Sequence, residues 1–186
     1  MKRIACSAVF AALVALMLSG CHGGGSAGTE LAAMTKAMAD AKSYKMTTVA
    51  SGNEITMEIE CPNKVRTITK AAGNTTEMVQ VGTDTYMKAG GKWMKSPVAG
   101  AAPGVCASAG TTTNTTAAAG GASPNITKGD STTINGVACQ QWVVGAAAAS
   151  ITYCIGADNY PVQMKTSTAT ITYSDWNKTT VEAPKI

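Results

Sequence analysis

Apolar and polar residues alternate along much of the chain after residue 44, and this pattern predicts β-strands. The alternation is clearest over residues 54–60 (EITMEIE), where Ile55, Met57 and Ile59 are separated by polar residues. Successive side chains of a strand point to opposite faces, so the three apolar residues share one face and the glutamates share the other. We therefore expect a half-buried strand with a charged outer surface.

Segments of the same kind recur along the chain and are separated by residues typical of tight turns. Strands are predicted at 44–50, 54–60, 65–71, 75–81 and 85–89, and again at 131–134, 138–144, 150–155, 161–166 and 169–173. Ser51-Gly52-Asn53 and Asn135-Gly136 have the composition of hairpin turns. Strands that follow one another through tight turns form a meander, so we expect about ten antiparallel strands.

The hydrophobic period is that of a helix over residues 29–42. Thr29 can cap its N-terminus, and the apolar residues that recur at helical spacing are Leu31, Met34, Met38 and Ala41. One helix and about ten strands predict an α+β fold. We expect a strongly curved antiparallel sheet, an incomplete half-barrel, with this helix and short lid segments on its concave side.

A low-complexity insertion interrupts the pattern at about residues 97–125. It consists almost entirely of Ala, Gly, Thr, Ser and Asn. Such a segment cannot bury enough apolar area to fold alone, so we expect a long surface loop within a single domain of residues 29–186.

The N-terminus has the pattern of an export signal. Lys2 and Arg3 precede a charge-free apolar run over residues 4–17, which is too short to span a membrane as a helix. The run ends in Leu18-Ser19-Gly20-Cys21, which resembles the bacterial lipobox. This resemblance implies that residues 1–20 are a signal peptide, that Cys21 is acylated, and that residues 21–28 form a flexible tether. An ordinary secretory signal followed by a chance cysteine is the alternative.

An acylated Cys21 implies a protein anchored to a membrane of the bacterial cell envelope, facing the periplasm or the exterior. The residue after the cysteine is His22 rather than Asp, which favours the outer membrane under the sorting rule of enteric bacteria.

Charge and composition narrow the possible partners. The 186-residue chain has a formal net charge of +4, and removal of Lys2 and Arg3 with the signal peptide leaves about +2. This charge is small and no basic cluster accompanies it, so we expect no nucleic-acid partner.

The composition limits which residues can form the core. The chain has 10 Met and 5 Tyr but a single Phe, and this residue, Phe10, lies in the predicted signal peptide. The core must therefore be built from Met, Val, Ile, Tyr, Trp and Ala.

Six cysteines are present, of which Cys6 leaves with the signal peptide and Cys21 is the lipidation site. The remaining four are Cys61, Cys106, Cys139 and Cys154. An even number in an exported chain indicates two disulfides, for which three connectivities are possible. The simplest places a bridge between Cys139 and Cys154, which lie in neighbouring strand segments, and leaves Cys61 to pair with Cys106. A four-thiolate metal site is the alternative, although no Cys-x-x-Cys pair is present, and we expect no metal and no cofactor.

The sequence contains few groups of residues that could form a catalytic site. His22 is the single histidine of the chain and falls in the tether, so a histidine-based triad in the domain is excluded. Glu54, Glu58 and Glu60 share one strand face and could act as acid and base, but an exposed solubilising face is the simpler interpretation. We expect no catalytic residues and no enzymatic activity.

Several segments resemble the acyl-chain-binding envelope lipoproteins of the LppX/LprG type, within the LolA/LolB-like superfamily. The matching segments are Tyr86-Met87-Lys88 with Gly91-Lys92-Trp93, the hairpin 133–137, the segment 155–162, and the segment 171–177 followed by Val181-Glu182-Ala183-Pro184. The resemblance implies a half-barrel of the eleven-stranded type with helices over its mouth. It also implies an apolar cavity that binds lipid acyl chains or lipidated proteins, possible transport between membranes, and a monomer anchored through Cys21.

The abundant methionines admit three interpretations. They can fill a core that has no Phe, form an adaptable wall for apolar ligands, or ligate Cu(I). In a half-barrel, side chains on the inward face can both fill the core and form the wall of a ligand cavity. The candidate ligand-binding residues are Met34, Met38, Met46, Ile55, Met57, Ile59, Met78 and Met87. A structural or protein-binding envelope lipoprotein without a ligand is the alternative function.

Overall fold

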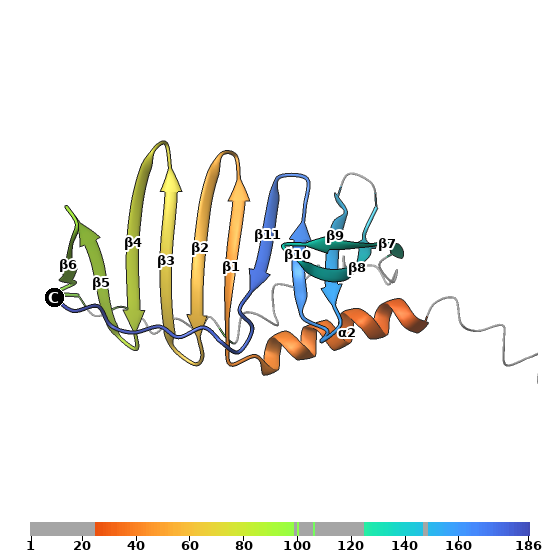
Figure 1. Ribbon diagram of the computed structural model, residues 1–186, viewed down its shortest axis with the longest axis horizontal. Coiled ribbons are helices and arrows are strands. Elements are labelled where there is room, and N and C mark those ends of the chain that lie inside the picture. Colours follow the sequence, from red (N-terminus) through yellow and green to blue (C-terminus); the bar gives the residue numbers. More distant parts are fainter. Residues whose placement is uncertain (1–24, 99, 101–105, 107–124, 147–148) are drawn as a thin grey trace, which may run out of the picture.

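In the described part of the chain, one antiparallel sheet has eleven strands, and a helix packs against one of its faces (Figure 1). The structure is a computed structural model that describes residues 25–98, 100, 106, 125–146 and 149–186. The predicted signal peptide, Cys21, the predicted lid segments and most of the insertion predicted at 97–125 lie outside these residues.

The helix and strands lie close to their predicted positions. Helix α2 spans Gly25–Asp40, and the strands are β1 Ser43–Ala50, β2 Asn53–Glu60, β3 Lys64–Ala71, β4 Asn74–Val81, β5 Asp84–Ala89, β6 Lys92–Lys95, β7 Ile126–Ile134, β8 Val137–Val144, β9 Ile151–Gly156, β10 Pro161–Lys165 and β11 Ala169–Ser174. In the part that the structure describes, no helix is long and apolar enough to cross a bilayer.

Two meanders share the sheet. The strand order is β6-β5-β4-β3-β2-β1-β11-β10-β9-β8-β7, so the pairing of β1 with β11 joins the N-terminal meander to the C-terminal one. Among the described strands, β6 and β7 are the two edges, and the sheet is not closed into a barrel. In Figure 1, β7 and β8 lie horizontally whereas β1–β6 stand upright, because the sheet curls strongly at the β7 end. The predicted half-barrel is confirmed.

Positive backbone φ angles explain the tight hairpins. Ser51 and Gly52 have φ of 48° and 78°, and Asn135 and Gly136 have φ of 51° and 81°. Two successive residues with positive φ are the requirement of a type I′ turn, whose twist matches that of the flanking strands. The predicted hairpin turns thus fix the strand register on both sides.

Most boundaries agree with the sequence prediction to within two residues, and three elements differ by more. Strand β6 was not predicted, because its four residues (KWMK) are too few to show alternation, and its pairing with β5 stabilises it. Strand β7 begins five residues before the predicted start at Ser131, across an irregularity between Lys128 and Ser131. Helix α2 begins at Gly25 instead of Thr29, which shortens the predicted tether, because extending a formed helix adds one hydrogen bond per residue.

The main core lies between α2 and one face of the sheet, which we call the helix face. Met34 and Met38 of α2 pack against Tyr44 and Ile59 of β1 and β2. Strands β8 and β9 extend this core with Trp142, Val144, Tyr153 and Ile155. The opposite face, which we call the outer face, has its own small core of Val79, Tyr86 and Val181. As predicted from composition, Met, Val, Ile, Tyr, Trp and Ala fill these cores.

Ion pairs cover the outer face of the N-terminal meander. Glu54 pairs with Lys70 at 2.8 Å, and Glu77 accepts hydrogen bonds from Arg66 and from Lys88, the latter at 3.1 Å. Partial burial alone would raise the pKa of Glu77, but the hydrogen bonds from Arg66 and Lys88 outweigh it and lower that pKa below its ordinary value. The predicted glutamate face is therefore an ion-pair network.

The chain after β11 crosses this network. The Val181 backbone N donates a hydrogen bond of 2.7 Å to Glu60 Oε2, and the Val181 side chain is buried. The hydrogen bond from Lys64, and next the one from Val181, lower the pKa of the Glu60 carboxyl. The crossing segment and the ion pairs enclose a cleft of about 480 Å³ lined by Arg66, Glu77, Lys88 and Trp93.

Both disulfides have the pairing favoured from the sequence. Cys61 is bonded to Cys106, with a sequence separation of 45, and Cys139 is bonded to Cys154, with a separation of 15. Cys139 and Cys154 lie on the neighbouring strands β8 and β9, next to Val162 on the outer face.

Replacing Cys139 and Cys154 together by Ala should lower the free energy of unfolding by about 3 kcal/mol, because the bridge restricts a loop of 15 residues in the unfolded chain. Urea denaturation of the double variant and the parent measures this loss. An unchanged denaturation midpoint would contradict the prediction.

Replacing Glu77 by Gln should lower the free energy of unfolding by about 1 kcal/mol at pH 7. Because folding lowers the pKa of Glu77, its contribution is complete above the ordinary value of 4.5 and is lost as the pH falls through the folded-state pKa. The difference between parent and variant should therefore shrink below about pH 4.5. Denaturation series at pH 7 and pH 3 test this, and a difference independent of pH would refute it.

Candidate functional site on the helix face

Strand register places five methionines in one row across the helix face. Met46 lies opposite Met57, Met57 opposite Thr67, and Thr67 opposite Met78. Met78 in turn lies opposite Met87, and Met87 opposite Met94. We call Met46, Met57, Met78, Met87 and Met94 the methionine row. It runs from β1, beside the core, to the edge strand β6.

The methionine row leaves the core and becomes exposed. Met46 and Met57 are partly buried against the core under α2. Met78 is 36% exposed, Met87 55% and Met94 54%. Ile55 is 37% exposed on the same face, beside the row. The helix face therefore carries a buried apolar half under α2 and an exposed apolar half over β2–β6.

The predicted ligand-binding residues fall into two groups. Met34, Met38 and Ile59 are buried in the core, with exposures of 1%, 7% and 2%. The others lie on the helix face where they are partly or largely accessible, and these are Met46, Ile55, Met57, Met78 and Met87. The structure adds Met94, which lies on the short, unpredicted strand β6 opposite Met87. The turn residues Gly90-Gly91, followed closely by Trp93 and Met94, were the available signal.

The surface around the row is uncharged over β2–β5. On one side of the methionine row, the neighbouring helix-face residues are Val65, Gln80 and Thr85. On the other side they are Thr69, Thr76 and Ala89. Glu54, Glu58, Glu60, Glu77 and Asp84 all belong to the outer face by the same register. The exposed half of the helix face is thus apolar or neutral, and the nearest charge that the register places on it is Lys92 of β6, opposite Ala89.

Aromatic rings fill the middle of the sheet. Trp176 stacks on Tyr44 at 4.9 Å and on Tyr160 at 4.5 Å between ring centroids, and its Nε1 donates a hydrogen bond to Pro161 O. Burial, assisted by Tyr44 and Tyr153, raises the pKa of Tyr173 to about 12, so this ring stays neutral. The space between α2 and the centre of the sheet is therefore occupied by side chains. Accessible apolar surface remains over β2–β6.

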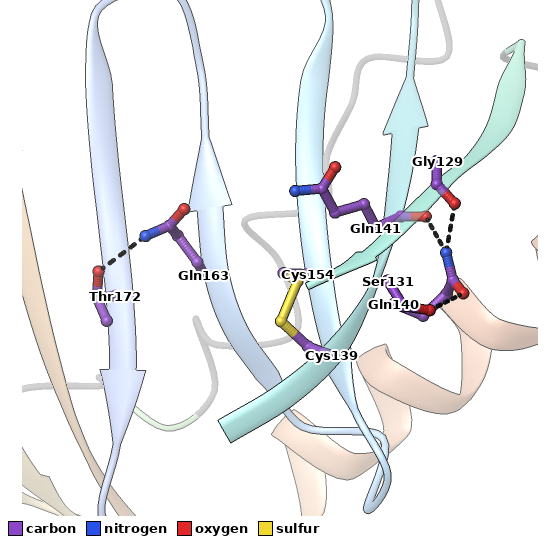
Figure 2. The surroundings of a disulfide bond; sticks show 8 residues. All are labelled: Gly129, Ser131, Cys139, Gln140, Gln141, Cys154, Gln163 and Thr172. Atoms are coloured by element: carbon purple, nitrogen blue, oxygen red, sulfur yellow. Dashed lines mark hydrogen bonds between the residues drawn. A yellow bond between two sulfur atoms is a disulfide. The ribbon is translucent and has the colours of Figure 1, made fainter. Parts of the chain in front are cut away.

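A second cleft of about 480 Å³ lies between α2 and strands β7–β9. Its lining is mixed, with Glu30 and Lys128 beside Trp142 and Ile155. Figure 2 shows how Gln140 fixes this end of the sheet by donating a 2.6 Å hydrogen bond to Gly129 O and accepting one from Ser131. The Cys139–Cys154 bridge joins the two neighbouring strands. Its charged and polar lining makes this cleft a poorer fit for an acyl chain than the methionine row.

Among the residues that the structure describes, no three His, Cys, Asp or Glu side chains are grouped as metal ligands. The lone histidine, His22, lies outside those residues.

No protein-family model matches the sequence, and no curated protein matches it. Solved structures do share its fold. LprF from Mycobacterium bovis superposes with a TM-score of 0.61 at 17% identity, covering 85% of this chain and 96% of LprF. The lipoprotein LppX from Mycobacterium tuberculosis superposes with a TM-score of 0.56 at 12% identity, covering 83% of this chain and 97% of LppX. The expected LppX-type fold is confirmed: this chain has the half-barrel architecture of LprF and LppX over nearly their whole length.

Proposed function

We propose that this protein is a lipid-anchored lipoprotein of the bacterial envelope that binds a hydrophobic ligand along the methionine row. The observation that supports this most is the exposure of Ile55, Met78 and Met87 on the face that also forms the core. Apolar surface that continues from the core into solvent is typical of ligand-binding grooves. Acyl chains of a lipid or of a lipidated protein are the proposed ligands.

The chemistry of the helix face suits acyl chains. Each buried methylene contributes about 0.8 kcal/mol, so a long chain laid along several strands gains substantial binding energy. Methionine side chains have three rotatable bonds and adapt to chains of different shape. The uncharged rows on either side of Met78 and Met87 avoid the cost of burying a charge beneath the ligand.

The N-terminal signal supports an anchored protein. Cys21 is the proposed acylation site, and α2 begins at Gly25. Four residue steps reach at most about 14 Å, so the start of α2 would lie within that distance of the anchor. We place the domain close to a membrane, with the outer membrane favoured because His22 follows Cys21. A monomer that receives lipid from one membrane and releases it to another fits this arrangement.

A structural or protein-binding lipoprotein is the second candidate. The dense aromatic packing around Trp176 favours it, because the space under α2 is filled by side chains. The two candidates differ in one measurable property, which is whether the detergent-free protein carries a lipid.

Ile55→Asp and Met87→Asp should each abolish copurification of lipid, because each places a carboxylate under the proposed acyl chain. Both positions are exposed, so the variants should fold. Native mass spectrometry of the Cys21→Ser protein, purified from periplasm without detergent, measures bound lipid. Val49→Asp is the matched control, since Val49 is 48% exposed on the outer face and its substitution should leave bound lipid unchanged.

A parent protein that carries no lipid, even after incubation with envelope lipid extract, would favour the structural role. Equal loss of lipid in Val49→Asp and Met87→Asp would show that the helix face is not the site.

Cys21→Ser should also abolish incorporation of labelled palmitate and release the protein from the membrane fraction, because the thiol is the proposed acylation site. Palmitate labelling and fractionation of cells that express the parent or the variant test this. A variant that still sediments with membranes in high salt would contradict an anchor at this cysteine.

A further inference from the structure

Methionine is confined to one face of the outermost N-terminal strands. Met78, Met87 and Met94 occupy the helix face of β4, β5 and β6. The apolar residues of the outer face on the same strands are Val79, Val81, Tyr86 and Trp93. Valine and aromatic residues favour strands, whereas methionine has no such preference. A need for apolar surface alone would be met by Val or Tyr on both faces, so what distinguishes the helix face is a property particular to methionine, either its flexible side chain or its thioether.

The register brings these three thioethers together. Met78 and Met87 are directly opposite on neighbouring strands, and so are Met87 and Met94. Directly opposite residues have Cβ atoms about 4.5–5.5 Å apart. Each methionine side chain has three rotatable bonds, and all three of these residues are exposed. Their sulfur atoms can therefore converge on a single ion above β5.

The ligand chemistry selects a soft monovalent ion. Thioethers are neutral, soft ligands that favour Cu(I) over hard or divalent ions. No carboxylate lies on the helix face of β2–β6, since the acidic residues of these strands lie on the outer face. A divalent ion would have no counter-charge here, whereas a single positive charge held by three neutral sulfurs needs less compensation.

The cysteines do not compete for the same ion. Cys61, Cys106, Cys139 and Cys154 are all held in disulfides. In an oxidising compartment thiolates are lost to such bonds, whereas thioethers keep their lone pairs. Met78, Met87 and Met94 are thus the most exposed soft ligands among the residues that the structure describes.

We propose that Met78, Met87 and Met94 form a binding site for Cu(I). The site goes beyond the hydrophobic-ligand function proposed above and rests on different chemistry, because it requires sulfur rather than apolar area. Ag(I) is the probe of choice, since it has the same charge and softness and needs no reductant, so both disulfides remain intact.

Titration of Ag(I) into the full-length chain carrying Cys6→Ser and Cys21→Ser, in chloride-free buffer, tests the site. These substitutions leave no free thiol. We expect one equivalent to bind and to shift the ε-methyl NMR signals of Met78, Met87 and Met94. Met87→Leu and Met94→Leu should each weaken Ag(I) binding at least about tenfold, since each removes one of three ligands.

Met164→Leu is the matched control, because Met164 lies on the helix face of β10, away from the three residues, and packs against the core. Its Ag(I) affinity should equal that of the parent. Native mass spectrometry of the same two variants measures bound lipid independently of Ag(I) affinity. This measurement separates the metal site from the lipid site, whichever of the two fails.

Three outcomes would overturn the proposal. One is a parent protein that binds no Ag(I) at micromolar concentration. Another is unchanged affinity in both leucine variants. The third is a shift of the methyl signals of Met46 and Met57 in place of those of the three exposed methionines.

Discussion

Among the described strands, the pairing of β1 with β11 is the one that joins the two meanders, and the remaining architecture depends on it. This pairing sets Met46 opposite Tyr173, next to the stacked ring of Trp176. It also brings the end of β11 beside the start of β1, where Asn177 N donates to Ser43 O and Lys42 N donates to the Asn177 side chain. The chain can then pass from the Trp176 stack on the helix face to Val181 on the outer face. The pairing of β1 with β11, which we call the seam, thus connects structure on both faces of the sheet.

That seam divides the helix face into two halves with different properties. On one side, α2 and the aromatic rings fill the surface, and the core there is closed. On the other side, the strands continue to β6 without a described helix above them, and Met87 and Met94 remain more than half exposed. The packing at the seam and under α2 stabilises the half-barrel. Strands β4–β6, which are distant from it, can therefore expose apolar side chains to water. The ion pairs of Glu77 and the buried Val181 stabilise these strands from the outer face.

Much of this arrangement follows from local sequence patterns. The alternation over 54–60 and the turn residues at 51–53 and 135–136 were sufficient to predict the strands beside them. The predicted export of the chain and the positions of the four cysteines favoured the observed disulfide pairing. Strand β6, which carries Met94, was missed because four residues carry too little periodicity. The methionine row itself could not be predicted, because it depends on the register of five hairpins at once. Once Ser51-Gly52 and the equivalent turns fix those registers, a slip by one residue would move every methionine to the outer face.

Methionine is the residue that reconciles the two proposed uses of this surface. An acyl chain requires apolar contact from Met78 and Met87, and a soft ion requires their sulfur lone pairs, so both ligands draw on the same atoms. A bound ion pulls the thioethers together and places a positive charge where a chain would lie, whereas a bound chain spreads the side chains apart. The two ligands should therefore disfavour each other, and by linkage each must weaken the other by the same factor. A surface of Val or Leu could bind lipid but could not couple it to a metal, which gives the restriction of methionine to this face a physical reason.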